Sequence, residues 1–124
     1  MELEILNFDF TICKLDSTKN ICLNDEIYFV GRTDKEISLV CLTKKTPENI
    51  SAREDDRKCF RIAGVLDFSL TGILAKISVL LAENQIGIFA VSTFNTDYIF
   101  VKSENFNRTI EVLNAAGYAI KNNF

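Results

Sequence analysis

The sequence has no histidine, a single proline and four cysteines without CxxC spacing. Without histidine, the chain lacks the commonest general base near neutral pH and every Ser–His or Cys–His nucleophile pair. It also has no glycine-rich phosphate loop, no GxSxG elbow and no HExxH motif. We therefore expect no catalytic residues, no cofactor and no metal site. The cysteines are expected to be small buried hydrophobes in a reducing compartment: Cys13, Cys22, Cys41 and Cys59.

Long hydrophobic runs and a field of positive charge are also missing. No apolar run reaches the roughly 18 residues needed to span a bilayer, and the starting segment MELEILNFDF has acids where a secretory signal has lysines. We therefore expect a cytoplasmic protein that does not associate with a membrane. The formal net charge is -3 and the pI is about 5.0, with the basic residues scattered. Nucleic acid is therefore not an expected partner.

The chain does have 124 residues, of which 48% are hydrophobic, enough to bury roughly two-thirds of its unfolded surface. In the first half, alternation from Leu6 to Ile12 predicts a half-buried strand. The segments from Ile27 to Val30 and from Ile37 to Leu42 flank a polar turn at residues 31–35, which predicts a hairpin. Residues 43–57 are charged and contain the single proline, so we expect a solvated linker with at most one helical turn there.

The second half predicts strands and helices in the order β-α-β-β-α-β. Apolar residues from Leu70 to Leu81 form one helical stripe, with Ser69 or Thr71 as its cap. Ser103 is expected to cap the second helix, and Gly117 to end it. The predicted strands are residues 60–65, the buried central strand 86–91, 98–101 and the closing edge strand 118–120. This order predicts an α+β, ferredoxin-like unit, an antiparallel sheet with both helices on one face.

The two halves share a weak internal repeat. Phe29–Val40 (FVGRTDKEISLV) and Ala90–Val101 (AVSTFNTDYIFV) run from strand through turn to strand with equal lengths, which aligns Glu36 with Asp97. We therefore expect residues 1–57 to be a degenerate copy, with shortened helical connections, of the complete unit at residues 58–124.

Residues 64–102, GVLDFSLTGILAKISVLLAENQIGIFAVSTFNTDYIFVK, resemble the ACT domains, small regulatory modules that bind amino acids. They are most similar to the branch of bacterial ACT proteins that looks like the animal cytosolic arginine sensors. The most specific piece is STFNTDYIFV, followed by GVLDFSLTGIL. MELEIL at the start and YFVGRTDKEISLV in the first hairpin also look like that branch. The resemblance thus covers most of the chain.

The resemblance implies that each ferredoxin-like ACT unit pairs edge to edge with another and binds a small molecule between them. The arginine sensors carry four such units in one chain and this chain has two, so the resemblance implies a homodimer. It also implies which positions contact the ligand, in the corner that opens the first helix, before the second hairpin and within it: Asp67, Leu70, Gly72, Gly87, Ile88, Thr93, Phe94, Asn95 and Asp97.

Elementary chemistry favours the same places. The carboxylate of an amino acid suits the exposed N–H groups at a helix N-terminus, and Gly72 has no Cβ to block its approach. The ammonium needs acceptors, which Asp97 or Asn95 could supply together with the carbonyls of residues 87–88. The arginine sensors carry an acidic residue where this chain has Leu70, which favours a ligand with a neutral or apolar side chain.

Plainer interpretations stay open for these residues. Gly72 could permit close packing of helix on sheet, and Asp97 could satisfy only its own turn. In the first hairpin, Arg32, Thr33 and Glu36 could line a second pocket or form a solvated turn with a weak salt bridge.

Three functions follow from these interpretations. The leading hypothesis is a non-catalytic regulatory protein that binds a small amino acid between the ACT units of a homodimer. The second is a dimerisation or interaction module that has kept the fold and lost the ligand. An enzyme is the least supported, because no nucleophile and base are recognisable.

Overall fold

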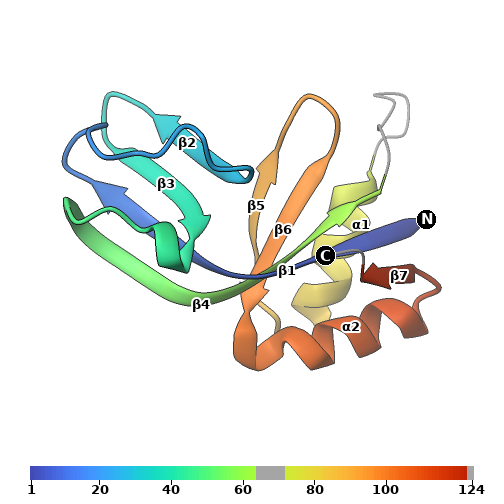
Figure 1. The fold of residues 1–124 in the computed structure, drawn as a ribbon. Helices are drawn as coiled ribbons and strands as arrows, with labels where there is room; N and C mark the ends of the chain where they lie inside the picture. Colours follow the sequence, from blue (N-terminus) through green and yellow to red (C-terminus); the bar gives the residue numbers. More distant parts are fainter. Residues whose placement is uncertain (64–71, 123–124) are drawn as a thin grey trace. The chain divides into compact units, whose positions relative to one another are not determined.

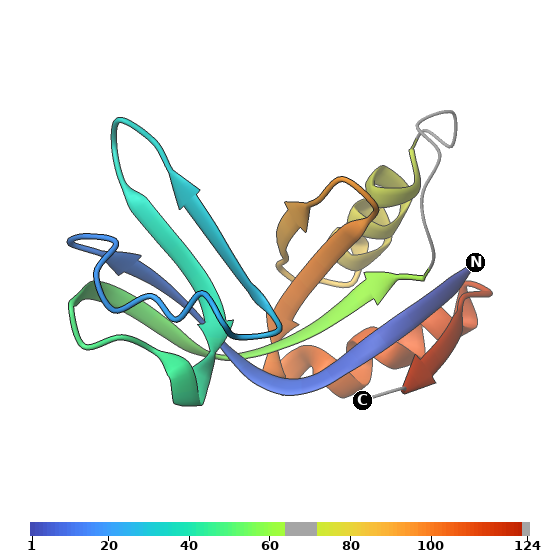
Figure 2. The same ribbon diagram turned by 45° about the horizontal axis from the view of Figure 1, so that its top comes forward.

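The computed structural model describes residues 1–63 and 72–122. The chain forms two compact units, a larger unit of Met1–Asn7 with Lys58–Phe124 and a smaller unit of Phe8–Arg57. Two long strands, β1 (Glu2–Leu15) and β4 (Ile50–Ile62), each contribute one end to each unit. Their blue and green ribbons can be followed in Figure 1 and Figure 2.

The larger unit is an α+β sheet with the strand order β7-β1-β4-β6-β5. It has the predicted ferredoxin-like order of elements, with one addition. The first residues of β1 lie between β4 and β7 and run parallel to β7, with Glu2 opposite Ala119. The elements that follow β4 are α1 (Ile73–Glu83), β5 (Phe89–Ser92), β6 (Asp97–Lys102), α2 (Phe106–Ala115) and β7 (Ala119–Asn122).

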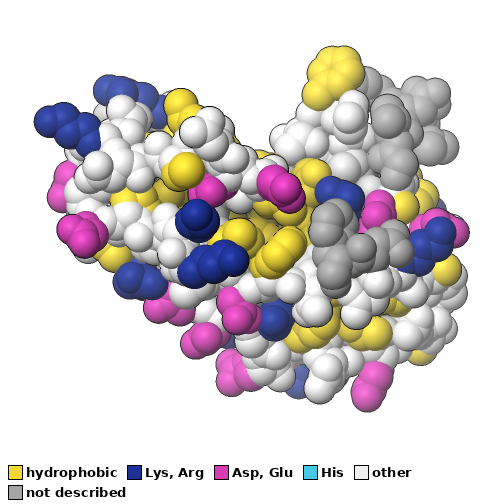
Figure 3. All heavy atoms as spheres, viewed as in Figure 1, with side chains coloured by type: hydrophobic (Ala, Val, Ile, Leu, Met, Phe, Trp, Pro, Cys, Tyr) yellow, Lys and Arg dark blue, Asp and Glu magenta, His cyan; other side chains and the backbone are white. Residues whose placement is uncertain are grey.

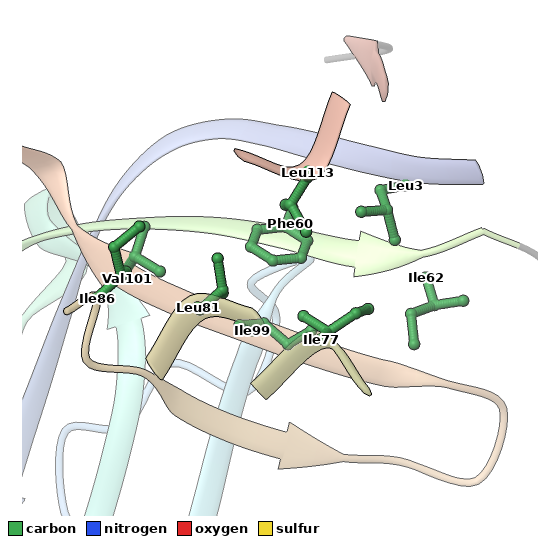
Figure 4. Packing of buried hydrophobic residues seen from close by; sticks show 9 residues of the cluster. All are labelled: Leu3, Phe60, Ile62, Ile77, Leu81, Ile86, Ile99, Val101 and Leu113. Atoms are coloured by element: carbon green, nitrogen blue, oxygen red, sulfur yellow. The ribbon is translucent and has the colours of Figure 1, made fainter. Parts of the chain in front are cut away.

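Both helices of the larger unit share one buried cluster with its sheet. Alternate residues of a strand point to the same face, so Phe60 and Ile62 of β4 face the helices together with Ile99 and Val101 of β6. Because α1 and α2 both pack into this cluster, they cover the same face of the sheet. Figure 4 shows the nine side chains that meet there: Leu3, Phe60, Ile62, Ile77, Leu81, Ile86, Ile99, Val101 and Leu113.

The two predicted helices are present with shifted starts. The helix predicted from Leu70 begins at Ile73, and its proposed caps, Ser69 and Thr71, lie outside the described residues. The second helix follows a 3-10 turn, η2 (Ser103–Asn105), so Ser103 opens that turn and makes no side-chain cap to α2. The predicted end of α2 is confirmed, because Gly117 has a φ of 97°, a backbone conformation that favours glycine.

The smaller unit pairs its strands in the order β2-β3-β1-β4. The predicted hairpin is confirmed as β2 (Tyr28–Arg32) and β3 (Ile37–Leu42), two antiparallel strands with Arg32 opposite Ile37. No α-helix occurs between residues 8 and 57. This unit buries its own small cluster, made of Cys13, Leu15, Leu39 and Cys41.

The linker predicted for residues 43–57 is wrong. One 3-10 turn, η1 (Thr43–Lys45), is present, but the chain forms β4 from Ile50 onward. The charges of this strand pair with near neighbours: Arg53 Nη2 lies 2.8 Å from Asp55 Oδ1, and Arg57 Nη2 lies 2.8 Å from Glu54 Oε2. The first part of β4 is mostly exposed, so it has no apolar face to bury and is held by its backbone hydrogen bonds. The hydrophobicity pattern of the sequence therefore gave no sign of a strand there.

The central strand predicted for residues 86–91 is also wrong. The strand β5 begins only at Phe89, and it lies at the edge of the sheet. Ile86 packs into the buried cluster as part of the connection from α1, and its N–H donates to the carbonyl of Leu81 at 2.9 Å. The apolar side chains of Ile86 and Ile88 are therefore explained by their packing against the buried cluster. The strand β5 itself is mostly exposed.

Candidate ligand-binding site

The tip of the β5–β6 hairpin is closed by two threonines. Ser92 and Asp97 are the last paired residues of the strands. The N–H of Thr93 donates to the carbonyl of Thr96 at 2.8 Å, and the N–H of Thr96 donates to Thr93 Oγ1 at 3.3 Å. Phe94 and Asn95 lie between them, and the Phe94 side chain is 89% exposed. The turn is thus closed by hydrogen bonds between Thr93 and Thr96, and it presents a large exposed ring.

Thr96 also ties this hairpin to the end of β4. Its side chain is 7% exposed, and its hydroxyl donates to the carbonyl oxygen of Ile62 at 2.8 Å. Ile62 is the last residue of β4, after which the chain leads toward the predicted corner at residues 67–72. Thr96 therefore anchors the tip of the β5–β6 hairpin to the end of β4. The sequence interpretation did not single out this residue.

Replacing Thr96 by valine should destabilise the larger unit by about 1–3 kcal/mol, because the buried carbonyl of Ile62 would lose its partner. Urea unfolding followed by circular dichroism would measure the change. Thr96→Ser keeps the hydroxyl and should cost clearly less. A Thr96→Val variant as stable as the wild type, or a larger loss in Thr96→Ser than in Thr96→Val, would mean that the methyl group contributes more than the hydrogen bond.

The carboxylate of Asp97 lies at the start of β6, beside this turn. The side chain is half-buried, and its Oδ1 accepts a hydrogen bond of 2.6 Å from the hydroxyl of Ser92. The hydroxyl and the carboxylate face each other across the strand pair, and this hydrogen bond orients the carboxylate. A carboxylate so placed can attract a ligand cation more strongly than a neutral acceptor can.

The N-terminus of α1 begins at Gly72, which has a φ of 84°. A Cβ built at Gly72 would meet no atom within 4 Å. The glycine is therefore explained by its left-handed backbone, and not by close packing of the helix on the sheet. The first N–H groups of a helix have no partners inside the helix, so this end of α1 can offer donors to an anion.

The other predicted site residues fall in different places. Gly87 and Ile88 lie in the connection between α1 and β5, where Gly87 is exposed and Ile88 packs partly against the buried cluster. They follow the C-terminal end of α1, so the length of the helix, about 16 Å for its eleven residues, separates them from Gly72. Asp67 and Leu70 lie outside the described residues.

The alignment of Glu36 with Asp97 is wrong by one position. In the smaller unit, the N–H of Thr33 donates to the carbonyl of Glu36 at 2.9 Å, the same bond that Thr93 makes to Thr96 in the larger unit. Thr33 thus matches Thr93, Glu36 matches Thr96, and Ile37 matches Asp97, since each of these last two residues begins the second strand of its hairpin. The first hairpin therefore has no carboxylate at the position of Asp97.

A second cluster of polar side chains lies on β1, β4 and β6 of the larger unit, and its members contact one another. Arg61 Nη2 of β4 lies 3.6 Å from Glu4 Oε2 of β1, and Arg61 Nη1 donates to Tyr98 Oη at 3.4 Å. The Arg61 guanidinium carbon also lies 5.9 Å from the Tyr98 ring centroid. These contacts link three adjacent strands, so the group is best explained as part of the sheet's own structure.

The cysteines behave mostly as predicted. Cys13, Cys41 and Cys59 are buried, but Cys22 is exposed. Burial raises the pKa of the Cys13 thiol to about 11, and it also raises the pKa values of Cys41 and Cys59. These three side chains are therefore neutral near pH 7.

Within residues 1–63 and 72–122, no group of three or more Cys, Asp or Glu residues could hold a metal ion. Neither of the α-helices in those segments is long and apolar enough to cross a membrane. Acidic and basic side chains are interspersed over the face shown in Figure 3.

The chain belongs to the ACT domain family, because residues 52–115 match the ACT domain. Its fold is also that of a solved protein from Agrobacterium tumefaciens, Atu0741, with a TM-score of 0.86 and 32% sequence identity over 99% of this chain and 93% of the other. A search among curated proteins found no match.

Two further solved structures share the fold at lower identity. A protein of unknown function from Vibrio cholerae, VC0802, has a TM-score of 0.68 and 20% identity over 92% of this chain and 88% of its own. The ligand-free regulatory subunit of aspartate kinase from Thermus thermophilus has a TM-score of 0.63 and 11% identity over 94% and 97% of the two chains. The pair of ACT-like units thus resembles an aspartokinase regulatory subunit in fold.

Proposed function

We propose that this protein is a non-catalytic regulatory ACT protein that binds a small amino acid between the ACT units of a cytoplasmic homodimer. The observation that carries the proposal is the β5–β6 hairpin, which holds the Asp97 carboxylate beside a turn anchored to β4 through Thr96. The equivalent hairpin of the smaller unit has Ile37 in place of Asp97. We therefore expect one ligand site per chain, formed by the larger unit.

The two ends of an amino acid would be bound by different groups. The ammonium would bind Asp97, with Asn95 and the turn backbone nearby, and the carboxylate would bind the N–H groups that follow Gly72 at the start of α1. Phe94 is exposed and could cover an apolar ligand side chain. With Leu70 at the position of the sensors' acidic residue, we favour a neutral or apolar amino acid over arginine, although the bacterial branch resembles the arginine sensors.

A site between two copies explains the separation of the remaining residues. Gly72 and the segment of Gly87 and Ile88 lie at opposite ends of α1, about 16 Å apart. A small amino acid is much shorter than this distance, so both cannot contact it within one unit. They could contact the same ligand if one copy supplied Gly72 and another supplied Gly87 and Ile88.

A thermal-unfolding panel with each of the twenty amino acids at millimolar concentration tests the proposal. A ligand at a hundredfold over its dissociation constant adds about 2.7 kcal/mol, which raises the midpoint by on the order of 10 °C in a domain of this size. A selective rise would support a sensor and identify the ligand. A folded protein whose midpoint responds to none of them would contradict the proposal.

Asp97→Ala should then weaken binding of that amino acid by about 10- to 100-fold, because a charge-assisted hydrogen bond contributes roughly 1.5–3 kcal/mol. Isothermal titration would measure the affinity. Asp34→Ala is the matched control, since Asp34 is an exposed acid in the first hairpin and should bind as the wild type does. Unchanged affinity in Asp97→Ala would remove Asp97 as the ammonium partner.

A ligand-free interaction module is the second candidate, and the edge strand β5 favours it. β5 has a free position beside it in the described sheet, and Phe89 is 36% exposed there. An exposed edge strand can pair with another chain without any ligand. A stable dimer whose midpoint responds to no amino acid would support this function instead.

A further inference from the structure

The outer face of α1 is an apolar surface with one positive and one negative charge. The inner face of the helix buries Ile77 and Leu81 against the sheet. On the outer face, a groove of about 380 Å³ is lined by Ala75, Lys76, Val79, Leu80 and Glu83. Val79 is 56% exposed at the middle of this stripe. A helix that is apolar on both sides is usually covered on both sides, so the outer face is suited to a partner.

The two charges lie symmetrically about the middle of the groove. Lys76 and Glu83 are both exposed and are equally far in sequence from the point between Val79 and Leu80. With their spacing of two helical turns, they lie on the same stripe as Val79 and Leu80. Among the residues that the structure describes, neither charge has an ion-pair partner.

We infer that this face binds the same face of a second copy, with the two α1 helices antiparallel about a two-fold axis between Val79 and Leu80. Such an axis places Lys76 of each copy opposite Glu83 of the other, so two ion pairs flank an apolar centre. The inference rests on the homodimer of the proposed function. It adds the surface and the register through which the two copies meet.

Lys76 and Glu83 favour the antiparallel pair of α1 helices over a parallel pair and over a membrane surface. A parallel pair of helices about a two-fold axis would place Lys76 against Lys76 and Glu83 against Glu83, which is repulsive. A helix that binds anionic lipid carries several basic residues on its polar face, whereas α1 has one basic and one acidic residue. A second copy therefore supplies an ion-pair partner to both Lys76 and Glu83, whereas an anionic membrane surface would attract Lys76 alone.

Charge reversal in the full-length chain tests the register. Lys76→Glu and Glu83→Lys should each weaken self-association by about tenfold or more at low salt, because each replaces two attractive pairs by two repulsive pairs. Sedimentation equilibrium without ligand would measure the dissociation constants. Lys44→Glu, an exposed reversal on η1 of the smaller unit, is the control and should leave them unchanged.

Combinations of variants that restore the ion pairs between positions 76 and 83 make the test specific. Lys76→Glu and Glu83→Lys proteins mixed in equal amounts should form a heterodimer about as tight as the wild-type dimer, because both pairs become attractive again. The double variant should also recover self-association. If the wild type is monomeric, if the single variants dimerise as the wild type does, or if neither the mixture nor the double variant recovers, the inference is overturned.

These outcomes differ from a failure of the proposed ligand. A wild-type dimer that behaves as expected in the charge reversals, but whose melting temperature responds to no amino acid, supports this interface and contradicts the sensor. A ligand response in a protein that stays monomeric at all concentrations contradicts this interface and the site between two copies, and it supports amino-acid binding within one chain. Because the substituted side chains are exposed, unchanged circular dichroism and thermal midpoints should confirm that each variant is folded.

Discussion

Phe60→Ala should lower the free energy of unfolding by about 3–5 kcal/mol, which is the range for removing a buried aromatic ring. Phe60 has no exposed surface and lies at the centre of the cluster between sheet and helices. The helices, β1, β4 and β6 all contribute to this cluster, so a cavity at Phe60 cannot be filled by moving a single element. A typical domain has only about 5–15 kcal/mol of stability in total.

Urea unfolding of the two proteins would measure this loss. Phe94→Ala is the matched control, because the same ring is removed from a side chain that is 89% exposed. We expect that control to change stability by less than about 0.5 kcal/mol. A small loss in Phe60→Ala would show that the cluster between the sheet and helices is loosely packed.

The second large effect is expected at alkaline pH. The pKa of Cys13 is raised to about 11 from 9.0, mainly by burial and then by the neighbouring Cys41, with Asp55 acting in the same direction and Arg53 in the opposite one. Because the folded-state pKa lies above the unfolded value, the neutral thiol stabilises the fold fully below about pH 9. This contribution is lost as the pH rises toward 11. Two pKa units correspond to about 2.7 kcal/mol.

The pH dependence of unfolding in the wild type and in Cys13→Ala would test this expectation. The variant has a lower stability at neutral pH because it loses packing, so the informative quantity is the further loss between pH 8 and 11. That loss should be smaller in Cys13→Ala by about 2–3 kcal/mol. Cys22→Ala, which removes an exposed thiol, should keep the wild-type slope. Equal slopes in all three proteins would mean that Cys13 does not contribute.

The hairpins and helices could be predicted from the sequence because their signals are local. β3 has the predicted bounds, Ile37–Leu42, and Gly117 ends α2 as expected. The charged part of β4 could not be predicted, because its backbone partners come from strands distant in sequence and its charges pair with each other. Likewise, the apolar spacing of Ile86 and Ile88 fits a strand, although both side chains pack against the core from a loop.

In the candidate site, too, local features could be predicted from the sequence and contacts between distant residues could not. The hairpin and its two polar ends are visible in STFNTD, and so the turn was expected. Thr96 was not, because its partner Ile62 lies 34 residues away and nothing near Thr96 in the sequence marks it as buried. The one-residue error in aligning Glu36 with Asp97 arose because equal segment lengths do not fix the pairing register, which here depends on the bonds of Thr33 and Thr93.

The insertion of β1 beside β7 affects how the nascent chain folds. Leu3 has no exposed surface and packs in one cluster with Leu113, while Glu2 pairs with Ala119. During synthesis at about 5–20 residues per second, these partners emerge on the order of ten seconds after Leu3 itself. Throughout that interval, the cluster around Leu3 lacks its partner from α2, and the start of β1 lacks its pairing with β7. The beginning of β1 therefore gains its last packing and pairing partners only when α2 and β7 have been synthesised.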